Sequence, residues 1–544
     1  MGSLHGRRPS GPHSEVRHRT KEHSRDGKAA GASLRRGGGT NLSLVEIFGP
    51  LVHLLTSAHL MGLIILAIPI GMFFGAVPGL GGKIAIVLMI PFVFGMDPLA
   101  GSVFLLAMHS VVHTGGSIPS ILFGVPGTGP DAATIVDGFP MAQRGEAGRA
   151  LGASLGASGV GGVIGALFLA AMLPVLRPVV LAFSPAEFFL LALFGITFIA
   201  MLSGRSLIKG IAVGMLGLLV SLIGLDPHTG SQRYTFDQLF LWDGVSVVAA
   251  VLGIFAIPEM MALGVKGGAI AQIKGKIARY DLRQVLDGIV DVFRNPWLTV
   301  RTSIIGAVIG AIPGLGGDAA SWLCYGHAVQ SCKNPETFGK GDVRGVIAPE
   351  TANNSKEGGS LLPTLFFGVP GSSGMAILIG AFVMLGIQPG PQMALHGMDF
   401  VWSLIWALAL ANVLSIFVFL AFAPAFSLMV YVRGALLIPF VLVLAFLGAY
   451  LSEGAWENML LLLVVGVLGY FLKKYRWPRA PFVIGLVLGK IAEDSIHKAL
   501  AIWGPTFFLR PMSLFLILLI VLTIVFYVVR QRRADKVEGV HYDV

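Results

Sequence analysis

The sequence predicts an all-α membrane protein that crosses the bilayer many times. Three observations support this fold class: hydrophobic residues make up 55% of the chain, charged residues make up only 12%, and the mean hydropathy is +0.79. A soluble domain carries about 25% charged residues. A chain of 544 residues with this composition has more apolar surface than a soluble core can bury, so lipid must be part of its solvent.

The two ends of the chain are more polar than the rest. Residues 1–42 are rich in Gly, Ser, His and Arg and carry more basic than acidic side chains, which predicts a disordered basic tail. Basic residues mark the cytoplasmic side of a membrane protein, although such a tail is also compatible with binding to anionic lipid or nucleic acid. Four basic residues directly follow the last apolar run, so both termini are expected in the cytoplasm, with 531–544 as the C-terminal tail; they are Arg530, Arg532, Arg533 and Lys536.

Apolar stretches follow the tail in close succession. The first, near 42–55, has the spacing of an amphipathic helix at the membrane surface, and the next, 60–77, is long enough to span. Further spans are expected near 151–174, 183–203, 207–224, 245–263, 296–312, 399–423, 434–451, 456–472 and 511–530. Shorter or Gly/Pro-interrupted stretches predict re-entrant or broken helices at 83–94, 98–112, 319–331, 361–387 and 481–490. The expected total is about ten to twelve transmembrane helices.

Three short motifs occur twice, in the same order. They are Pro-Gly-Leu-Gly-Gly at 78–82 and 313–317, Gly-Gly-Ser at 115–117 and 358–360, and Phe-Gly-Val-Pro-Gly at 123–127 and 367–371. Such recurrence predicts two homologous repeats. We expect the first half at 43–263, a cytoplasmic or interfacial basic linker at 264–295 and the second half at 296–530.

The orientation of the two repeats relative to the membrane has two possible answers. Arg144 and Arg149 follow the first copy of the motifs and no basic residue stands at the matching place in the second copy, which favours inverted repeats. Basic loops before both copies favour a parallel arrangement. We expect inversion, which is the commoner arrangement among transporters with broken helices.

The duplicated motifs have a chemistry of their own in lipid. Pro removes a backbone donor and breaks a helix, and freed backbone groups are tolerated in the membrane only where they are buried in protein or line a wet cavity. The N-terminus of a half-helix suits an anion, and free carbonyls suit a cation. Paired interruptions in two halves therefore predict a central transport site, although Gly and Pro also serve tight packing and kinks.

Ionisable residues lie close to the motifs. Glu350, Lys356 and Glu357 precede the second Gly-Gly-Ser motif; such groups are functional when they lie at membrane depth, but a solvated position is the simpler interpretation. His109 and His113 are four residues apart, which places them on one helix face. That spacing suits a metal or a proton relay, but without a third ligand it favours packing or hydrogen bonding.

These residues resemble the large membrane subunit of the tripartite tricarboxylate transporters, the TctA family. The resemblance runs from about residue 44 to about residue 520 and omits the basic tail. The chain departs from the family pattern where His109 and His113-Thr114 replace Tyr and Tyr-Gly, and where Lys83 follows the first turn. The matching stretches are 75–82, 115–127, 137–142, 145–152, 209–210, 224–230, 347–371, 480–489 and 492–493.

The resemblance implies a three-part uptake system in the bacterial inner membrane. Its partners would be a small membrane subunit, an extracytoplasmic solute-binding protein, membrane lipid and a carboxylate substrate such as a tricarboxylate (citrate, for example), a dicarboxylate or an aromatic acid. An ion gradient, commonly of sodium and otherwise of protons, would drive it without a cofactor. No Gly-x-x-x-x-Gly-Lys-Ser/Thr loop for ATP is present, and we expect neither an enzyme nor a nucleic-acid partner.

The candidate binding residues are the glycines and small polar residues in and beside the motifs. We expect carboxylate oxygens to contact backbone N–H and hydroxyl donors, and ions to contact carbonyl and Asn oxygens. Asp318 is also a candidate ion or proton site. The full set is Gly81, Gly82, Ser117, Gly127, Thr128, Gly316, Gly317, Asp318, Asn353, Asn354, Gly371 and Ser372.

Three other functions remain open at this point. An ion-coupled organic-anion permease that works without a binding protein would use the same site. A membrane enzyme would need an acid, a base and a nucleophile, or a metal, in one cavity, and the sequence shows no such group beyond the His109/His113 pair. A passive channel is disfavoured, because the repeats predict a gated central site.

The tail should be dispensable for transport. If residues 1–40 serve only as a topology signal, their deletion leaves carboxylate uptake by membrane vesicles within about twofold of the full-length rate, because the next basic loops still orient the helices. Loss of uptake by a truncated protein that is inserted in normal amounts would show a further role for the tail.

Overall fold

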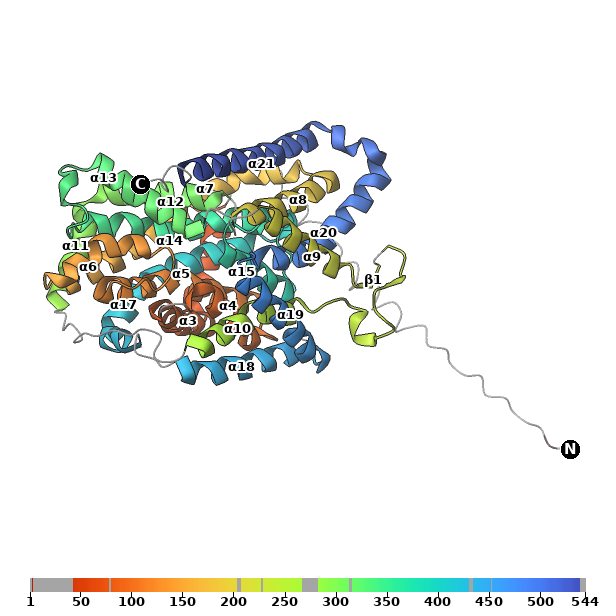
Figure 1. Ribbon diagram of the computed structural model, residues 1–544, viewed down its shortest axis with the longest axis horizontal. Coiled ribbons are helices and arrows are strands. Elements are labelled where there is room, and N and C mark those ends of the chain that lie inside the picture. The colour runs from red at the N-terminus through yellow and green to blue at the C-terminus, as the bar shows by residue number, and fades with distance from the viewer. Residues whose placement is uncertain are drawn as a thin grey trace. The chain divides into compact units, whose positions relative to one another are not determined.

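The computed structural model describes Gly2 and residues 43–77, 80–202, 207–226, 228–266, 282–312, 316–429, 434–451 and 453–538. It divides into two compact units, Met1–Gly49 and Pro50–Val544. Regular structure in the described residues is almost entirely helical, which confirms the all-α prediction (Figure 1). The predicted tail, apart from Gly2, and residues 267–281 of the basic linker lie outside the described residues.

Helices account for every apolar stretch that the sequence singled out. α21 extends to Glu538, beyond the predicted end of the second half at 530. The helices are α2 (Leu44–Thr56), α3 (Ala58–Ala76), α4 (Gly81–Val93), α5 (Pro98–Phe123), α6 (Ala132–Gln143), α7 (Ala147–Leu181), α8 (Pro185–Leu202), α9 (Leu207–Ser221), α10 (Val247–Lys266), α11 (Leu282–Arg294), α12 (Pro296–Ala311), α13 (Gly316–Ser331), α14 (Arg344–Phe367), α15 (Ser373–Met384), α16 (Gln392–His396), α17 (Met398–Met429), α18 (Gly434–Leu451), α19 (Glu457–Lys474), α20 (Ala480–Trp503) and α21 (Pro511–Glu538).

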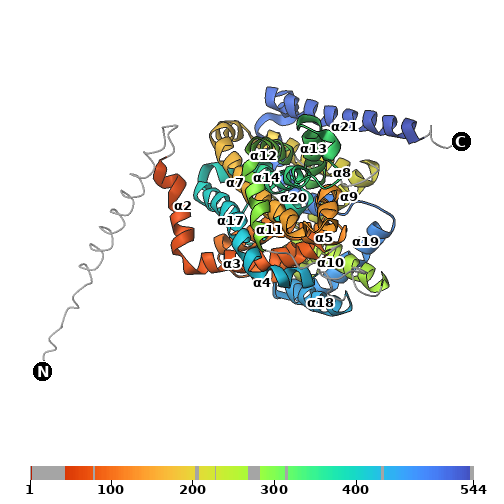
Figure 2. The ribbon, with the colours of Figure 1, turned by 90° about the vertical axis from the view of Figure 1, so that its left-hand side faces the viewer.

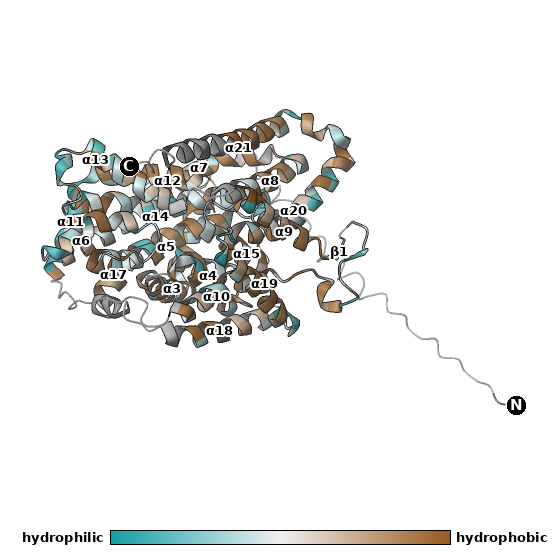
Figure 3. Ribbon diagram, in the orientation of Figure 1, coloured by the Kyte–Doolittle hydropathy of each residue, from teal (hydrophilic) through white to brown (hydrophobic). Residues whose placement is uncertain are grey.

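Within the part of the chain that the structure describes, four helices are long and apolar enough by themselves to cross a membrane. They are α3, α5, residues 147–176 of α7 and residues 398–422 of α17; α20 and α21, bent by 64°, add a fifth if they form one span. Hydrophobic residues cover most helices, and hydrophilic residues gather in loops such as those beside α13 and β1 (Figure 3). The structure thus supports a polytopic membrane protein, and the total of ten to twelve spans stays a prediction.

Two pairs of helices cross at glycine and make the same contacts. A β-carbon on Gly75 of α3 would lie 1.8 Å from the carbonyl oxygen of Val112 on α5, and one on Gly310 of α12 would lie 2.2 Å from that of Lys356 on α14. Backbones approach this closely only where a side chain is absent. The close crossings also pair Gly71 with Met108, Gly306 with Ala352, Gly115 with Met72 and Gly359 with Ala307.

The matched contacts fix the register between α5 and α14. Gly115 corresponds to Gly359. A β-carbon on Gly115 would lie 2.3 Å from the carbonyl oxygen of Met72 on α3, and one on Gly359 would lie 1.9 Å from that of Ala307 on α12. The Gly-Gly-Ser motifs are therefore offset by one residue, because the second copy has an extra residue before Pro363. In this register His113 corresponds to Glu357.

The long helices exchange partners between the two halves of the chain. α7, from the first half, packs on α12 and α14, whereas α17, from the second half, packs on α3 and α5 (Figure 2). In the same way α10 packs on α18 and α19, and α20 packs on α8 and α9. The polar residues of α5 and α14 are consequently enclosed by helices from both halves.

A small β-hairpin interrupts the helical fold. β1 (Gly224–Leu225) pairs with β2 (Gln232–Arg233) in antiparallel fashion, and the sequence analysis did not predict it. The turn contains Gly230 at φ 69°, a conformation that glycine adopts without strain, and Asp226 caps it by accepting hydrogen bonds from the N–H groups of His228 (2.8 Å) and Thr229 (3.3 Å).

Two glycines of α3 should respond in opposite ways to a methyl group. Gly75→Ala forces the methyl against the backbone of α5 and should destabilise the protein by about 1–3 kcal/mol, the usual cost of overpacking. Gly62→Ala meets nothing within 4 Å and should leave stability unchanged or raise it by up to about 1 kcal/mol through helix propensity. Thermal unfolding of the two variants in detergent tests this, and equal midpoints would contradict the close crossing.

Candidate functional site

The helices α5 and α14 end in the same way, at the first Gly of the duplicated Phe-Gly-Val-Pro-Gly motif. Gly124 and Gly368 take left-handed conformations, φ 65° and 66°, and a proline lies five residues earlier in each helix. The chain then folds back along its own helix: Gly127 donates its N–H to the carbonyl of Gly116 (3.3 Å). A β-carbon on Gly127 would lie 2.5 Å from the Gly116 Cα, and one on Gly371 would lie 2.6 Å from the Ser360 Cα. Both broken turns are therefore packed tightly against helix backbone.

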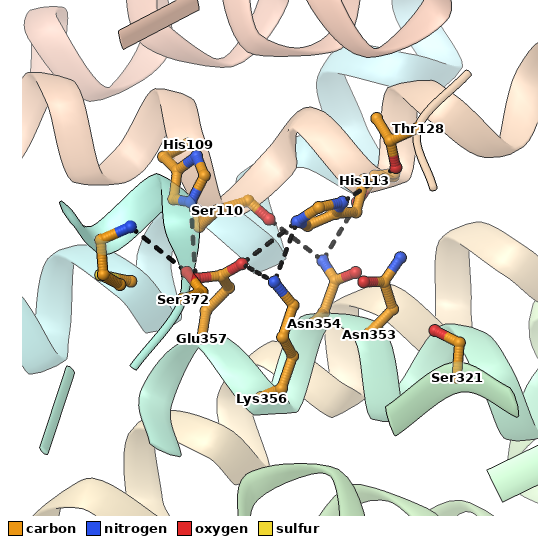
Figure 4. Close-up of polar contacts among 12 residues, drawn as sticks. His109, Ser110, His113, Thr128, Ser321, Asn353, Asn354, Lys356, Glu357 and Ser372 are labelled. Carbon is orange, nitrogen blue, oxygen red and sulfur yellow. Dashed lines mark hydrogen bonds and ion pairs between the residues drawn. The ribbon is translucent and has the colours of Figure 1, made fainter. Parts of the chain in front are cut away.

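Charged side chains of α5 and α14 meet in the interior (Figure 4). His113 Nε2 lies 3.1 Å from Glu357 Oε1 and 3.2 Å from Lys356 Nζ, and Lys356 itself forms a close ion pair with Glu357. His109 Nε2 lies 3.6 Å from Glu357 Oε2. These three ionisable side chains are almost completely buried, with Lys356 at 3%, Glu357 at 0% and His113 at 6% exposure. The interpretation that Glu350, Lys356 and Glu357 are solvated is therefore wrong.

The cluster continues from His113 to the segment after the first turn. His113 Nδ1 lies 3.2 Å from Thr128 Oγ1, and Thr128 donates from its hydroxyl (2.6 Å) and its N–H (2.9 Å) to Asp131 Oδ2. Asn353 on α14 donates to the other oxygen of Asp131 at 3.0 Å. These bonds form a closed path from α14 through α5 to residues 128–131 and back to α14.

The adjacent asparagine connects three helices. Asn354 Nδ2 donates to Asn412 Oδ1 on α17 (2.7 Å), to Thr114 Oγ1 (3.2 Å) and to the carbonyl of Ser110 (3.3 Å). Three buried oxygen atoms here have no hydrogen-bond partner: Asn354 Oδ1, Asn353 Oδ1 and Glu357 Oε2. Buried acceptors without partners are costly, so this region favours an added donor or cation.

His109 fills the space between two helix N-termini. A β-carbon on Gly82, in the first turn of α4, would lie 2.7 Å from His109 Nδ1, and one on Gly374, in the first turn of α15, would lie 2.6 Å from Nε2. Ser372 caps α15 by accepting a hydrogen bond from the Met375 N–H at 3.2 Å. Two positive helix ends thus flank one imidazole, which is an arrangement suited to an anion.

Glu350 occupies a separate buried pocket of hydroxyl groups. It accepts hydrogen bonds from Ser117 of α5 (2.9 Å), Thr134 of α6 (2.5 Å) and Ser158 of α7 (3.2 Å). The carboxylate of α14 thereby holds three helices of the first half together. Ser117, which the sequence predicted as a binding residue, faces this carboxylate.

A loop of the second half is held by α6 of the first half. Asp137 accepts hydrogen bonds from the N–H groups of Gly341 and Asp342, each 2.8 Å, and from the hydroxyl of Tyr325 at 3.0 Å. Within the loop, burial raises the pKa of Asp342, but hydrogen bonds from Arg344 and Thr337 outweigh this and hold the pKa below its usual value. The folded loop therefore keeps Asp342 charged.

The structure brings together some, but not all, of the predicted binding residues. Thr128, Asn353, Asn354 and Ser372 lie in the cluster of Figure 4. Gly81 takes φ 63° at the start of α4, where a β-carbon would lie 3.7 Å from Thr128 Cγ2, and Gly82 contacts His109. Gly316 and Gly317 begin α13, and the side chain of Asp318 lies outside the described residues, as do residues 78–79 and 313–315.

Sequence reasoning missed several members of the cluster. His113, Lys356 and Glu357 were noticed, but they were not assigned to the site, and Asp131 and Asn412 were not considered. The available signal was the spacing to the Phe-Gly-Val-Pro-Gly motifs, because His113 and Glu357 each lie ten residues before the motif's Phe. Among the described residues, no three His, Cys, Asp or Glu side chains are placed to hold a metal ion.

Comparison with known protein families matches residues 61–484 to the Tripartite tricarboxylate transporter TctA family. The chain belongs to the TctA family. An uncharacterized 52.8 kDa protein from the TAR-I ttuC′ 3′ region of Agrobacterium vitis is 30% identical over 446 residues, covering 80% of this TctA-family chain and 85% of the relative. An uncharacterized protein from the TAR-II ttuC′ 3′ region of the same organism is 32% identical over 197 residues, covering 36% of this chain and 81% of that relative. No solved structure matches.

Asn354 should be essential for transport rather than for folding. Asn354→Ala removes the donor that joins α14 to α17 and should abolish carboxylate uptake, at a stability cost of about 1–3 kcal/mol for the acceptors left unpaired. Asn458→Ala, on α19, removes a comparable buried amide that donates to Glu453 at 2.8 Å and should leave uptake unchanged. Uptake is measured per amount of inserted protein, and equal rates in the two variants would remove Asn354 from the site.

Proposed function

We propose that this chain is the large transmembrane subunit of a secondary active uptake system for carboxylates. The observation that carries the proposal is the meeting of polar residues from α5 and α14 at two matched helix breaks, enclosed by helices of both halves. Buried ionisable groups in a membrane protein mark transport pathways. The family implies other subunits of a tripartite transporter. We propose these to be a small membrane subunit and an extracytoplasmic solute-binding protein, in the bacterial inner membrane.

The proposal includes two homologous repeats related by inversion. The repeated crossings at Gly75 and Gly310, and the exchange of α7 and α17 between halves, support a two-fold relationship. Contact between His113 and Glu357 is a further support, because equivalent residues meet only at the axis that relates two repeats. Inversion would let the same site open to either side in turn.

Substrate would bind where the two helix N-termini converge. The first turns of α4 and α15, with the hydroxyl of Ser372, offer donors to carboxylate oxygens. The unpaired oxygens of Asn353 and Asn354 offer acceptors for a substrate hydroxyl or a cation. A carboxylate with more than one acidic group suits this mixture, and an ion gradient, of sodium or of protons, would drive its accumulation.

Uptake of radiolabelled carboxylates by vesicles that contain the chain and its small subunit tests the proposal. Citrate, succinate and an aromatic acid are each supplied with and without a sodium or pH gradient and with and without binding protein. Accumulation of at least one acid that requires both the gradient and the binding protein is expected. Accumulation without binding protein would favour a permease that works alone, and no accumulation of any acid would contradict the proposed function.

A further inference from the structure

The pair formed by His113 and Glu357 has features that fixed structural ion pairs lack. A fully paired Lys356–Glu357 ion pair would be neutral by itself, yet His113 lies within 3.2 Å of both partners. Glu357 Oε2 has no hydrogen-bond partner, and neither have the two ring nitrogens of His109. These buried basic atoms, with His109 Nε2 only 3.6 Å from Glu357 Oε2, can take up a proton within the cluster. We infer that His113 and Glu357 bind the proton that is co-transported with the carboxylate; this rests on the proposed function and names its coupling ion.

The hydrogen bonds define the state without the extra proton. A lysine ammonium only donates, so Nε2 of His113 accepts from Lys356 and the ring hydrogen sits on Nδ1. Nδ1 then donates to Thr128 Oγ1, whose own hydroxyl hydrogen points to Asp131. In this state Lys356 bridges two acceptors, Nε2 of His113 and Oε1 of Glu357.

A second state follows when a proton arrives from water and binds Nε2. The new N–H donates to Glu357 Oε1 across 3.1 Å, and the bond from Lys356 becomes a contact between two cations 3.2 Å apart. Lys356 must then turn away from His113, which changes the packing where α14 meets α5. The cluster gains one positive charge, which favours an entering carboxylate; release of the proton to the opposite side restores the first state.

The surroundings leave few other groups to take the proton. Lys356 and Lys83 of α4 are cations near the pair, and His109 lies beside Glu357. Asp131 is connected to the pair through Thr128 and Asn353, and Glu350 through Ser117. α15 contains no ionisable residue, and the side chain of Asp318 is outside the described residues. On the other packed helices, some ionisable groups have partners elsewhere: Asp137 bonds with Tyr325, Arg149 with Asp291 and Arg301 with Ser331. Others lie near helix ends, namely His59 in α3, Asp399 in α17, His396 in α16 and His327 in α13.

The position of the pair fits a carrier. His113 and Glu357 are equivalent residues in the matched register, so they lie at the point where the two halves are related to each other. A proton bound there can be reached from either side of the membrane when the two halves exchange conformations.

The test separates exchange from net uptake in vesicles that contain the chain, its small subunit and binding protein. Exchange of labelled for unlabelled carboxylate needs no net proton movement, whereas accumulation driven by a pH gradient does. We expect His113→Gln to lose pH-driven accumulation by about tenfold or more, whereas its exchange should fall much less, since Gln still accepts from Lys356. His327→Gln, outside the cluster, should match the wild type in both assays.

Proton movement itself is followed with a pH-sensitive dye outside the vesicles. Addition of carboxylate should make the outside more alkaline with wild type and not with His113→Gln or Glu357→Gln. Sodium-driven accumulation by the wild type with no proton movement would overturn the inference and leave the proposed function standing. Normal pH-driven accumulation by His113→Gln would also overturn it. Absence of both exchange and accumulation in the wild type would overturn the proposed function, and the inference with it.

Discussion

The close crossing of helix backbones at glycine is the constraint on which the rest of the structure depends. α3 lies against α5, and α12 against α14, at distances that leave no space for a β-carbon on Gly75 or Gly310. This contact fixes the rotation of α5 and α14 about their own axes. Polar residues of both helices then point to one another instead of into lipid, where an unpaired polar group costs several kcal/mol.

Once those helices are fixed, the polar interior is largely determined. Glu350, Asn354 and Glu357 lie on one helix, yet they reach partners on α5, α6, α7 and α17. Such a network replaces the hydration that each group would have in water, and it ties the first half to the second through side chains rather than through apolar packing alone. The few atoms left without partners mark the places where the protein interacts with something else.

The sequence was sufficient for the fold class and for the helices, because composition and apolar length are local properties. It also placed the ends of α3 and α12 just before the Pro-Gly-Leu-Gly-Gly motifs, since Pro and Gly act on their own backbone. It did not predict that α5 and α14 end at Gly124 and Gly368. It could not tell that Glu357 is buried, because burial depends on which helices pack against α14. The partners of Asp131 and Asn412 were hidden for the same reason, as both bond to residues more than fifty positions away.

Asp137 joins α6 to the loop before α14, which makes this part of the core rigid. Its carboxylate holds the loop before α14 through two backbone N–H groups, and Arg144 of the same segment bonds to the carbonyls of Lys340 and Gly341. The α5–α6 segment and the α13–α14 segment are therefore joined through α6 and the loop before α14, in addition to the contacts between α5 and α14. The two segments would therefore move together as one rigid unit. The hinges of any larger conformational change would have to lie outside them.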